Sequence, residues 1–158
     1  MESLGNTRAI EITRLALDGL SKRQQAIAAN TANVMTPDYQ RKQVAFEDQL
    51  QDILGQERAK DQIKQANSAA ISYHATSLDQ IQRPSAEQMA FLNQNSYKAY
   101  SPEVVSDFSN PDPNTGNNVN VEHEMMDMAK TGTQYTVLTT LENKMLSGLS
   151  EVIKGASV

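Results

Sequence analysis

The side chains that could perform acid–base or metal chemistry are few. The two histidines are His74 and His123, and neither has a second ligand at metal-binding spacing. His123 stands between Glu122 and Glu124, which is no zinc-hydrolase pattern and is better interpreted as a solvated helix face. The chain has no cysteine, no phosphate-binding glycine loop and no nucleophile elbow. We therefore expect a protein that is not an enzyme and holds no metal or cofactor.

A second polar cluster suits structural hydrogen bonding rather than catalysis. The stretch AIAANTANVMTPDYQRK, residues 26–42, places Asn30 and Asn33 near the end of a helix-forming run. Side-chain amides at such positions can bond backbone groups that a helix end leaves unpaired. The Thr36-Pro37 step that follows disfavours continuation of the helix. The sequence predicts a fixed corner at this point of the chain.

The element that leads into this corner is a long helix from about residue 7 to residue 34. Its apolar and small residues recur in alternating steps of three and four, a mean step near 3.5 that is typical of a coiled-coil seam. Small residues in the first stripe allow another helix to approach closely. The seam positions assigned to packing or assembly are Ile12, Ala16, Leu17, Leu20 and Ile27.

The end of the chain predicts the partner helix, from about residue 119 to residue 158. Asn120 is its expected N-cap, Glu122 and Glu124 occupy the first turn, and Lys154 with Gly155 mark its end. We interpret the methionines of its first turns as packing residues rather than as a promiscuous binding groove, and Gly132 as a place where a neighbour packs closely. The seam positions on this helix are Met125, Met128, Tyr135, Leu138, Leu141, Met145 and Leu149.

The middle of the chain is less regular. Residues 44–54 predict a short amphipathic helix, which extends past Gly55 only weakly because Ile63 is its one clear apolar anchor. Residues 71–78 are compatible with a strand and residues 85–92 with a short helix capped by Ser85. The remaining proline- and asparagine-rich segment is turn chemistry. Both a flexible excursion and a small folded appendage stay open for residues 55–118.

These elements predict a mainly α protein in which the terminal helices pack as an antiparallel, coiled-coil-like pair around a variable, partly irregular middle. Residues 1–54 and 119–158 then form one discontinuous domain. The apolar fraction of 39% is below the ~45–50% typical of globular proteins, and aromatic residues make up only 5%. Such a composition predicts a thin core, or one that partners complete.

The charge and hydropathy of the chain argue against a nucleic-acid-binding protein and against a membrane-spanning one. The net charge is −5, a poor basis for gripping nucleic acid. Residues 1–42 carry six Lys/Arg against four acids, and the remainder eight against fifteen, an asymmetry that suits head-to-tail pairing of subunits. The N-terminal segment lacks the basic and apolar regions of a cleaved secretory signal, and no run approaches the ~20 apolar residues of a membrane span. We expect a soluble protein, or one exported without a cleaved signal.

The stretch AANTANVMTPDYQRKQVAFEDQL, residues 28–50, resembles the N-terminal signature of the bacterial flagellar axial proteins, the rod, hook and hook-associated families. That signature reads approximately A-x-N-[IL]-A-N-x-x-T-P-G-Y-[KR]. Thr31 stands where Ile or Leu is usual, and Asp38 where Gly would tolerate positive φ better. Asp is among the residues next best tolerated there. The matching positions are Asn30, Ala32, Asn33, Thr36, Pro37 and Tyr39.

The C-terminal block is similar to the same families independently. Residues 116–155 begin with GNNV, continue with an acidic, methionine-containing helix start, and carry a Gln134-Tyr135 step. The two blocks lie at the correct ends of the chain and in the correct order. The details favour a proximal-rod subunit, while the middle carries no resemblance.

The resemblance implies a structural subunit of the flagellar basal-body rod in the periplasm. Its implied partners are other rod and basal-body proteins, further copies of itself, and the flagellar type III export apparatus. Members of the family leave the cell unfolded through that apparatus and assemble at the growing tip. Two alternatives stay open: another rod subunit of the same family, and a cytoplasmic helical adaptor or export chaperone that binds a partner's helix.

Overall fold

The computed structural model describes residues 2–73 and 85–155, which fold into two compact units. Residues 1–47 and 101–158 make up the first unit, and residues 48–100 the second. The protein is mainly helical, with long N- and C-terminal helices that pack together, as the sequence predicted. No helix within the described ranges is both long and apolar enough to span a bilayer.

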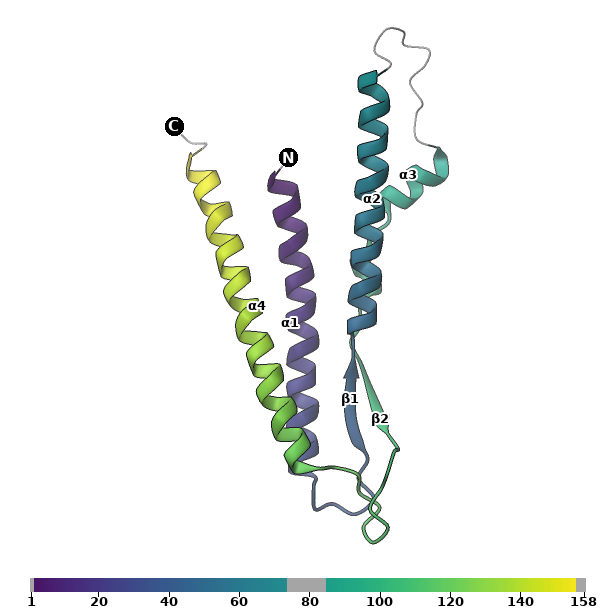
Figure 1. The fold of residues 1–158 in the computed structure, drawn as a ribbon, viewed down its shortest axis with the longest axis vertical. Helices are drawn as coiled ribbons and strands as arrows, with labels where there is room; N and C mark the ends of the chain where they lie inside the picture. Colours follow the sequence, from purple (N-terminus) through teal and green to yellow (C-terminus); the bar gives the residue numbers. More distant parts are fainter. Residues whose placement is uncertain (1, 74–84, 156–158) are drawn as a thin grey trace. The chain divides into compact units, whose positions relative to one another are not determined.

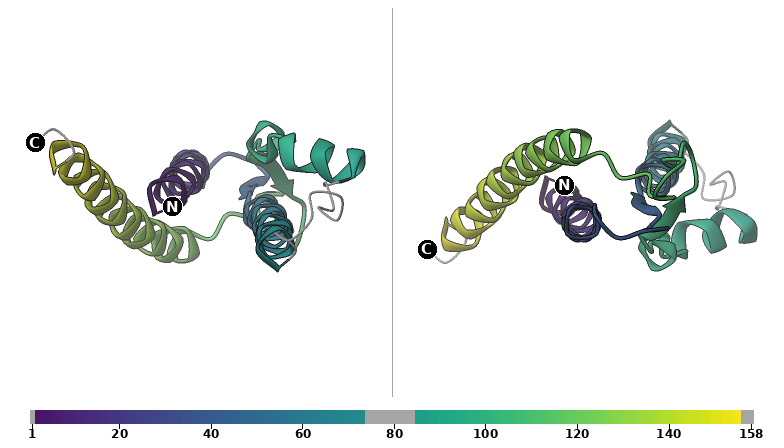
Figure 2. Two further views of the ribbon diagram at one scale, coloured as in Figure 1. Left: turned by 90° about the horizontal axis from the view of Figure 1, so that it is seen from above. Right: turned by 90° about the horizontal axis from the view of Figure 1, so that it is seen from below.

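The first unit is built on helices α1 (Glu2–Ala32) and α4 (Val121–Gly155), of 31 and 35 residues. They run antiparallel and lie side by side where α1 ends and α4 begins, and they separate toward the chain termini (Figures 1 and 2). Thr13, Leu20 and Ile27 are buried on α1 at steps of seven. On α4 the heptad positions Glu124 and Thr131 are also buried. The seven-residue repeat is the signature of a coiled-coil-like seam.

The start of α4 carries the predicted cap, and α1 ends close to the predicted position. The Asn120 side chain accepts a hydrogen bond from the backbone N–H of His123 at 3.1 Å, which confirms it as the N-cap of α4. Helix α1 ends at Ala32, two residues before the predicted boundary, and a hydrogen-bonded turn follows.

A two-stranded antiparallel sheet, absent from the prediction, completes the first unit. Strand β1 (Arg41–Ala45) pairs with β2 (Glu103–Asp107) in a register that places Arg41 opposite Asp107 and Ala45 opposite Glu103. Val44 on β1 and Phe46 just after it are buried with Leu20, Ala26 and Ile27, and these five side chains are the apolar core of the unit. The core is thin, as the composition indicated.

The second unit contains helices α2 (Glu47–Tyr73), α3 (Ala86–Asn93) and the 3-10 helix η2 (Ser96–Ala99). The helix predicted over 44–54 starts too early, because residues up to Ala45 form β1. Its extension past Gly55, which the sequence favoured only weakly, is present: α2 has 27 residues. Gly55 does not interrupt it because its flank is rich in helix-forming residues. Helix α3 has the predicted Ser85 cap, as a complete capping box with Gln88.

A buried lysine links α2 to η2 inside the second unit. Lys60 is 5% exposed, and its ammonium group donates to Glu57 Oε1 at 2.9 Å, to Ser96 Oγ at 2.8 Å and to the Gln94 carbonyl oxygen at 2.5 Å. All three ammonium protons therefore have acceptors. Of the strand expected over residues 71–78, Ile71 and Tyr73 belong to α2, and residues 74–78 lie outside the described part of the chain.

The α1–α4 seam makes a direct prediction for stability. Leu20→Ala removes a side chain that is 3% exposed, and we expect it to lower the free energy of unfolding by about 2–5 kcal/mol. The matched change Leu146→Ala, at a position 47% exposed on α4, should cost less than about 1 kcal/mol. Urea unfolding followed by far-ultraviolet circular dichroism measures both, and equal losses would contradict the seam.

Candidate functional site

The corner after α1 is closed by asparagine side chains. Asn33 Nδ2 donates to the Ala29 carbonyl at 2.8 Å, as predicted for an amide at a helix end. Asn117 comes from the loop before α4, and its Nδ2 donates to the carbonyls of Asn33, Val34 and Thr36 at 2.8–3.0 Å. These carbonyls follow the end of the helix, where no helical N–H is left to bond them; those of Asn33 and Thr36 also accept one turn hydrogen bond each, from the N–H groups of Thr36 and Tyr39. One asparagine, 84 residues away along the chain, thus fixes the turn.

The same two loops approach each other at Asp38 and Gly116. Asp38 has φ 57°, in the left-handed region that the family's usual glycine would occupy easily. Its backbone N–H donates to the Thr115 carbonyl at 2.8 Å. Gly116 has φ 68°, and a Cβ atom there would stand 3.3 Å from the Asp38 Cα and 2.2 Å from its Oδ1. Only glycine fits this contact without a shift of the loop.

Asn30 ties the end of α1 to strand β1. It is fully buried, and it exchanges two hydrogen bonds with the backbone of Lys42: its Nδ2 donates to the carbonyl at 2.9 Å, and its Oδ1 accepts from the N–H at 2.8 Å. This pattern occupies the backbone of β1 as a neighbouring strand would. Asn30 Oδ1 also accepts a hydrogen bond from the Tyr39 hydroxyl at 3.2 Å, and Asn30 Nδ2 also donates to Glu124 Oε2 at 3.0 Å. Sequence reasoning had placed its bonds at the helix end instead.

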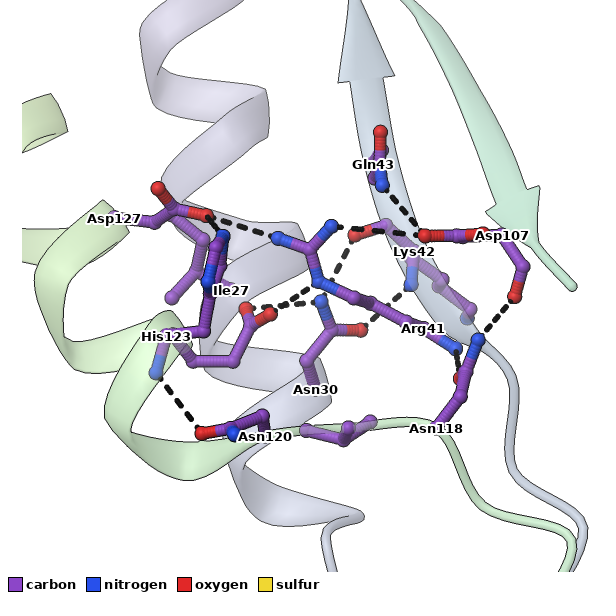
Figure 3. A network of polar contacts seen from close by, with 12 residues as sticks. Ile27, Asn30, Arg41, Lys42, Gln43, Asp107, Asn118, Asn120, His123 and Asp127 are labelled. Carbon is purple, nitrogen blue, oxygen red and sulfur yellow. Dashed lines mark hydrogen bonds and ion pairs between the residues drawn. The ribbon is translucent and has the colours of Figure 1, made fainter. Parts of the chain in front are cut away.

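The buried carboxylate of Glu124 is bonded by Asn30 and Arg41, both of which Figure 3 labels. Glu124 is 0% exposed, so the interpretation of this part of α4 as a solvated face is wrong for Glu124, although His123 and Glu122 are exposed. The Arg41 guanidinium donates through Nε to Glu124 Oε1 at 2.5 Å and through a terminal nitrogen to Asp127 at 2.9 Å. A third carboxylate, that of Asp107 on β2, lies 3.9 Å from Arg41. We call Asn30, Arg41, Glu124 and Asp127 the corner network.

The loop before α4 forms hydrogen bonds with the strands next to the corner network. Asn118 Oδ1 accepts the Arg41 backbone N–H at 2.7 Å, and Asn118 Nδ2 donates to the carbonyls of Asp107 and Ser109 at 2.6 and 3.0 Å. Asn118 therefore connects β1, β2 and the start of α4. Asn117, Asn118 and Asn120 each form hydrogen bonds with backbone groups. These bonds explain why the GNNVN stretch contains three asparagines.

Two titratable side chains next to the corner network, Tyr39 and Asp107, have shifted pKa values. Burial, and then the neighbouring Glu124 carboxylate, raise the pKa of the Tyr39 phenol above its usual value. Its contribution to stability is present below the pKa of a free tyrosine and is lost as the pH rises through the folded-state pKa. Hydrogen bonds from Ser109 lower the pKa of Asp107. That contribution is present above the pKa of a free aspartate and is lost as the pH falls.

The polar side chains of the site hold backbone segments in place. Every oxygen and nitrogen of the Asn30 amide and the Glu124 carboxylate already contacts another group of the chain. Within residues 2–73 and 85–155, no group of three or more His, Asp or Glu side chains is placed to hold a metal ion. The site is a structural joint between α1, β1 and α4.

The predicted motif residues meet at this joint to different degrees. Asn30 is buried, Asn33 and Tyr39 are half-buried, and Ala32, Thr36 and Pro37 are exposed at the turn. Arg41, Glu124, Asn117 and Asn118 were missed as functional residues. The signal that could have found them is the GNNV block itself, because adjacent asparagines before a helix are suited to bonding backbone at chain reversals.

The predicted seam residues divide into three groups. Leu20 and Ile27 are buried; Met125, Met128 and Leu141 are 66%, 36% and 46% exposed. The methionines are therefore not core residues of the folded chain, and their role in assembly stays a prediction. The half-buried group comprises Ile12, Ala16, Leu17, Tyr135, Leu138, Met145 and Leu149.

The chain is similar over nearly its whole length to two curated proteins. It is 27% identical over 146 residues to the flagellar basal body rod protein FlgB of Borrelia hermsii, covering 92% of this chain and 96% of that protein. It is 25% identical over 147 residues to the flagellar basal body rod protein FlgB of Borreliella burgdorferi, covering 93% and 96%. No model of a known protein family matches the chain.

Two long terminal helices, joined at a hydrogen-bonded corner, thus accompany a similarity to FlgB proteins over 92–93% of the chain. The similarity extends through the middle of the chain, where the sequence motifs gave no guidance. These relatives support a FlgB-like protein, which confirms the resemblance found in the two terminal blocks.

The corner network predicts a strong coupling between Arg41 and Glu124. Arg41→Met leaves a buried carboxylate with Asn30 as its remaining donor, and we expect a loss of about 3–5 kcal/mol in the free energy of unfolding. Adding Glu124→Leu should recover at least about 2 kcal/mol, because the unpaired charge is then gone. Chemical denaturation of the single and double variants measures the coupling.

A surface arginine supplies the control for this experiment. Arg14 pairs with Glu11 at 3.6 Å, and its side chain is 64% exposed. Arg14→Met should change the free energy of unfolding by no more than about 0.5 kcal/mol. Additive losses for Arg41 and Glu124 would show that the two residues do not act as a pair.

Two glycines should respond to alanine with opposite signs. Gly116→Ala places a Cβ against Asp38 at positive φ and should cost about 1–3 kcal/mol. Gly132 lies inside α4 with nothing of the chain within 4 Å of an added Cβ, so Gly132→Ala should stabilise the isolated chain by about 0.5–1 kcal/mol. Thermal unfolding of both variants tests this, and a stabilising Gly116→Ala would rule out the tight contact.

Proposed function

We propose that the chain is a structural subunit of the flagellar basal-body rod that assembles through its terminal helices. The observation that carries the proposal is the similarity to FlgB proteins, whose alignments include both helices of the α1–α4 pair. The corner network adds physical support, since it holds both terminal helices to β1 and so presents them in one fixed relation.

The surface of α4 supports assembly through this helix. Met125, Met126, Val137 and Ile153 are each more than 60% exposed. A two-helix pair has few layers in which to bury such side chains, and contiguous exposed apolar groups mark interaction sites. Burial against neighbours would then supply the stability that the thin core of the single chain does not.

The proposal includes partners and a route. The chain contacts further copies of itself and other rod and basal-body proteins, and it leaves the cell through the flagellar type III export apparatus without a cleaved signal. Its destination is the periplasmic rod. A thin core suits such a route, because a marginally stable chain is easily held unfolded before export and gains its order on assembly. In the assembled subunit, residues 1–54 and 119–158 act as one discontinuous domain.

Two other assignments compete with this one. Another rod subunit, such as FlgC, would share the terminal blocks, but both curated relatives reported above are FlgB. A cytoplasmic adaptor or export chaperone would explain an exposed helical surface without export. It gives no reason for a similarity that reaches from the corner to the end of α4.

Deletion of the gene, followed by complementation, tests the proposal. We expect loss of motility and of the rod on deletion, and recovery with the wild-type chain, which then fractionates with purified basal bodies. Leu138→Asp should prevent incorporation, because a carboxylate buried without a partner in the seam costs several kcal/mol. Leu138→Met nearly conserves volume and should still be incorporated.

The location of the protein distinguishes the assignments. Wild-type chain found only in the soluble cytoplasmic fraction would overturn the rod proposal and favour the adaptor. Incorporation of Leu138→Asp at the wild-type level would keep the rod but remove this seam from the assembly. Circular dichroism of the purified variant shows whether its helices still form.

A further inference from the structure

A groove runs along the first unit between α1, α4 and β1. It consists of two cavities of about 350 and 340 Å³, and Gln134 of α4 lines both. The smaller cavity is lined by apolar groups of Ala16, Leu20, Phe46, Val137 and Leu138. We call the two cavities together the docking groove. On α1 it extends from Ala16 to Ile27, about 16 Å or three helical turns.

The other half of the docking groove is cationic. Arg23, Arg41, Lys42 and Lys130 line the larger cavity, with Asp127 as the one carboxylate among its lining residues (Figure 3 shows its Arg41 and Asp127 side). Arg41 is engaged by the corner network, and Arg23 pairs with Glu47 at 2.6 Å. Within the described ranges, Lys42 and Lys130 have no carboxylate partner. An acidic group entering this end would find two ammonium groups that no carboxylate of the described residues neutralises, although that of Lys42 lies over the Tyr39 ring.

The same unit carries a surface of complementary chemistry. Val121, Met125 and Met128 are exposed on α4 at positions i, i+4 and i+7, and Gly132 continues the row. His123, Asp127, Lys130 and Gln134, which line the docking groove, have the same spacing two residues further on. Two residues turn a helix by about 200°, so the two rows lie on opposite faces of α4. We call Val121, Met125 and Met128, with the exposed Glu122 beside this row, the methionine patch.

The spacing of charge and apolar groups matches between the two surfaces. Glu122 lies six residues before Met128, about 9 Å along the helix axis. In the docking groove Lys130 lies seven residues before the apolar Val137, about 10 Å. If Met128 fills the apolar half, Glu122 reaches the cationic half when the two α4 helices point the same way. Methionine suits such a contact because its flexible, polarisable side chain fills irregular cavities.

We propose that the methionine patch of one copy docks into the docking groove of a second copy, with their α4 helices parallel. The two surfaces differ and lie on opposite faces, so the contact is head-to-tail, and successive copies form an open helical array rather than a closed dimer. The proposal rests on the rod function and adds to it the two surfaces through which identical subunits meet.

Photo-cross-linking inside assembled basal bodies tests the contact. A deletion strain receives two differently tagged copies, one with photoreactive p-benzoylphenylalanine in place of Met125 and one otherwise unmodified. After illumination, basal bodies are isolated and cross-linked peptides are mapped by mass spectrometry. We expect adducts from position 125 to residues 16–20, 44–47 and 133–138 of the second copy. If the bulky residue at position 125 blocks incorporation, the same replacement at Met128, which is 36% exposed and lies in the same row, takes its place.

Matched variants make the result specific. Val137→Asp in the second copy, at a position 61% exposed, puts a carboxylate into the apolar half and should reduce the adducts at least about tenfold. Thr140→Asp, an exposed α4 position that lines neither cavity, should leave the yield unchanged. The photoreactive residue at position 140 should give no adduct to the docking groove.

The remaining outcomes overturn the contact in distinguishable ways. Adducts between two methionine patches would show a symmetric contact, and adducts to a different protein would show that another partner occupies the patch. A chain present in basal bodies that gives no adduct would refute this docking but leave the rod function intact. A chain absent from basal bodies would refute the rod function, and this contact with it.

Discussion

The ion pair between Glu124 and Arg41 is the interaction on which the first unit depends. Both carboxylate oxygens are bonded, one by the arginine and the other by Asn30, so the buried charge has no unsatisfied side. The three residues belong to α4, β1 and α1, and a buried ion pair tolerates little displacement because partial loss of its partners leaves an uncompensated charge. Such a pair adds less to stability than to specificity: it selects one register of α1 against α4, which a thin apolar seam defines weakly.

Asparagine amides extend the same principle to the backbone. Asn30 bonds β1 as a neighbouring strand would, Asn117 closes the end of α1, and Asn118 joins β1 to β2. In a larger domain, further secondary structure would bond these groups. Here a few asparagine side chains bond these backbone groups in the loops and the two-stranded sheet. The outward faces of the helices therefore stay available for other contacts.

The sequence predicted the parts of the fold that follow from local periodicity and capping. The 3.5-residue repeat located α1 and α4, and Ser85 and Asn120 cap their helices as expected. The two strands were missed because five-residue strands with exposed faces carry no clear alternation. Their pairing joins residues that are 58 to 66 positions apart. Glu124 was misread because a carboxylate in the first turn of a helix has a sufficient local explanation in the helix dipole. Its true partner, Arg41, lies 83 residues away, and no local pattern links the two.

The corner network and the docking groove depend on the same three elements. Arg41 both pairs with Glu124 and lines the groove, and α1, β1 and α4 supply its walls. A change at the corner therefore alters the groove even where no groove residue is replaced. This gives a physical reason for a corner built from buried polar groups: in an assembly of identical subunits, a small error in the angle between α1 and α4 is repeated at every contact and accumulates along the array. Directional hydrogen bonds constrain such an angle more tightly than apolar packing, because their strength falls steeply as the donor and acceptor move out of line.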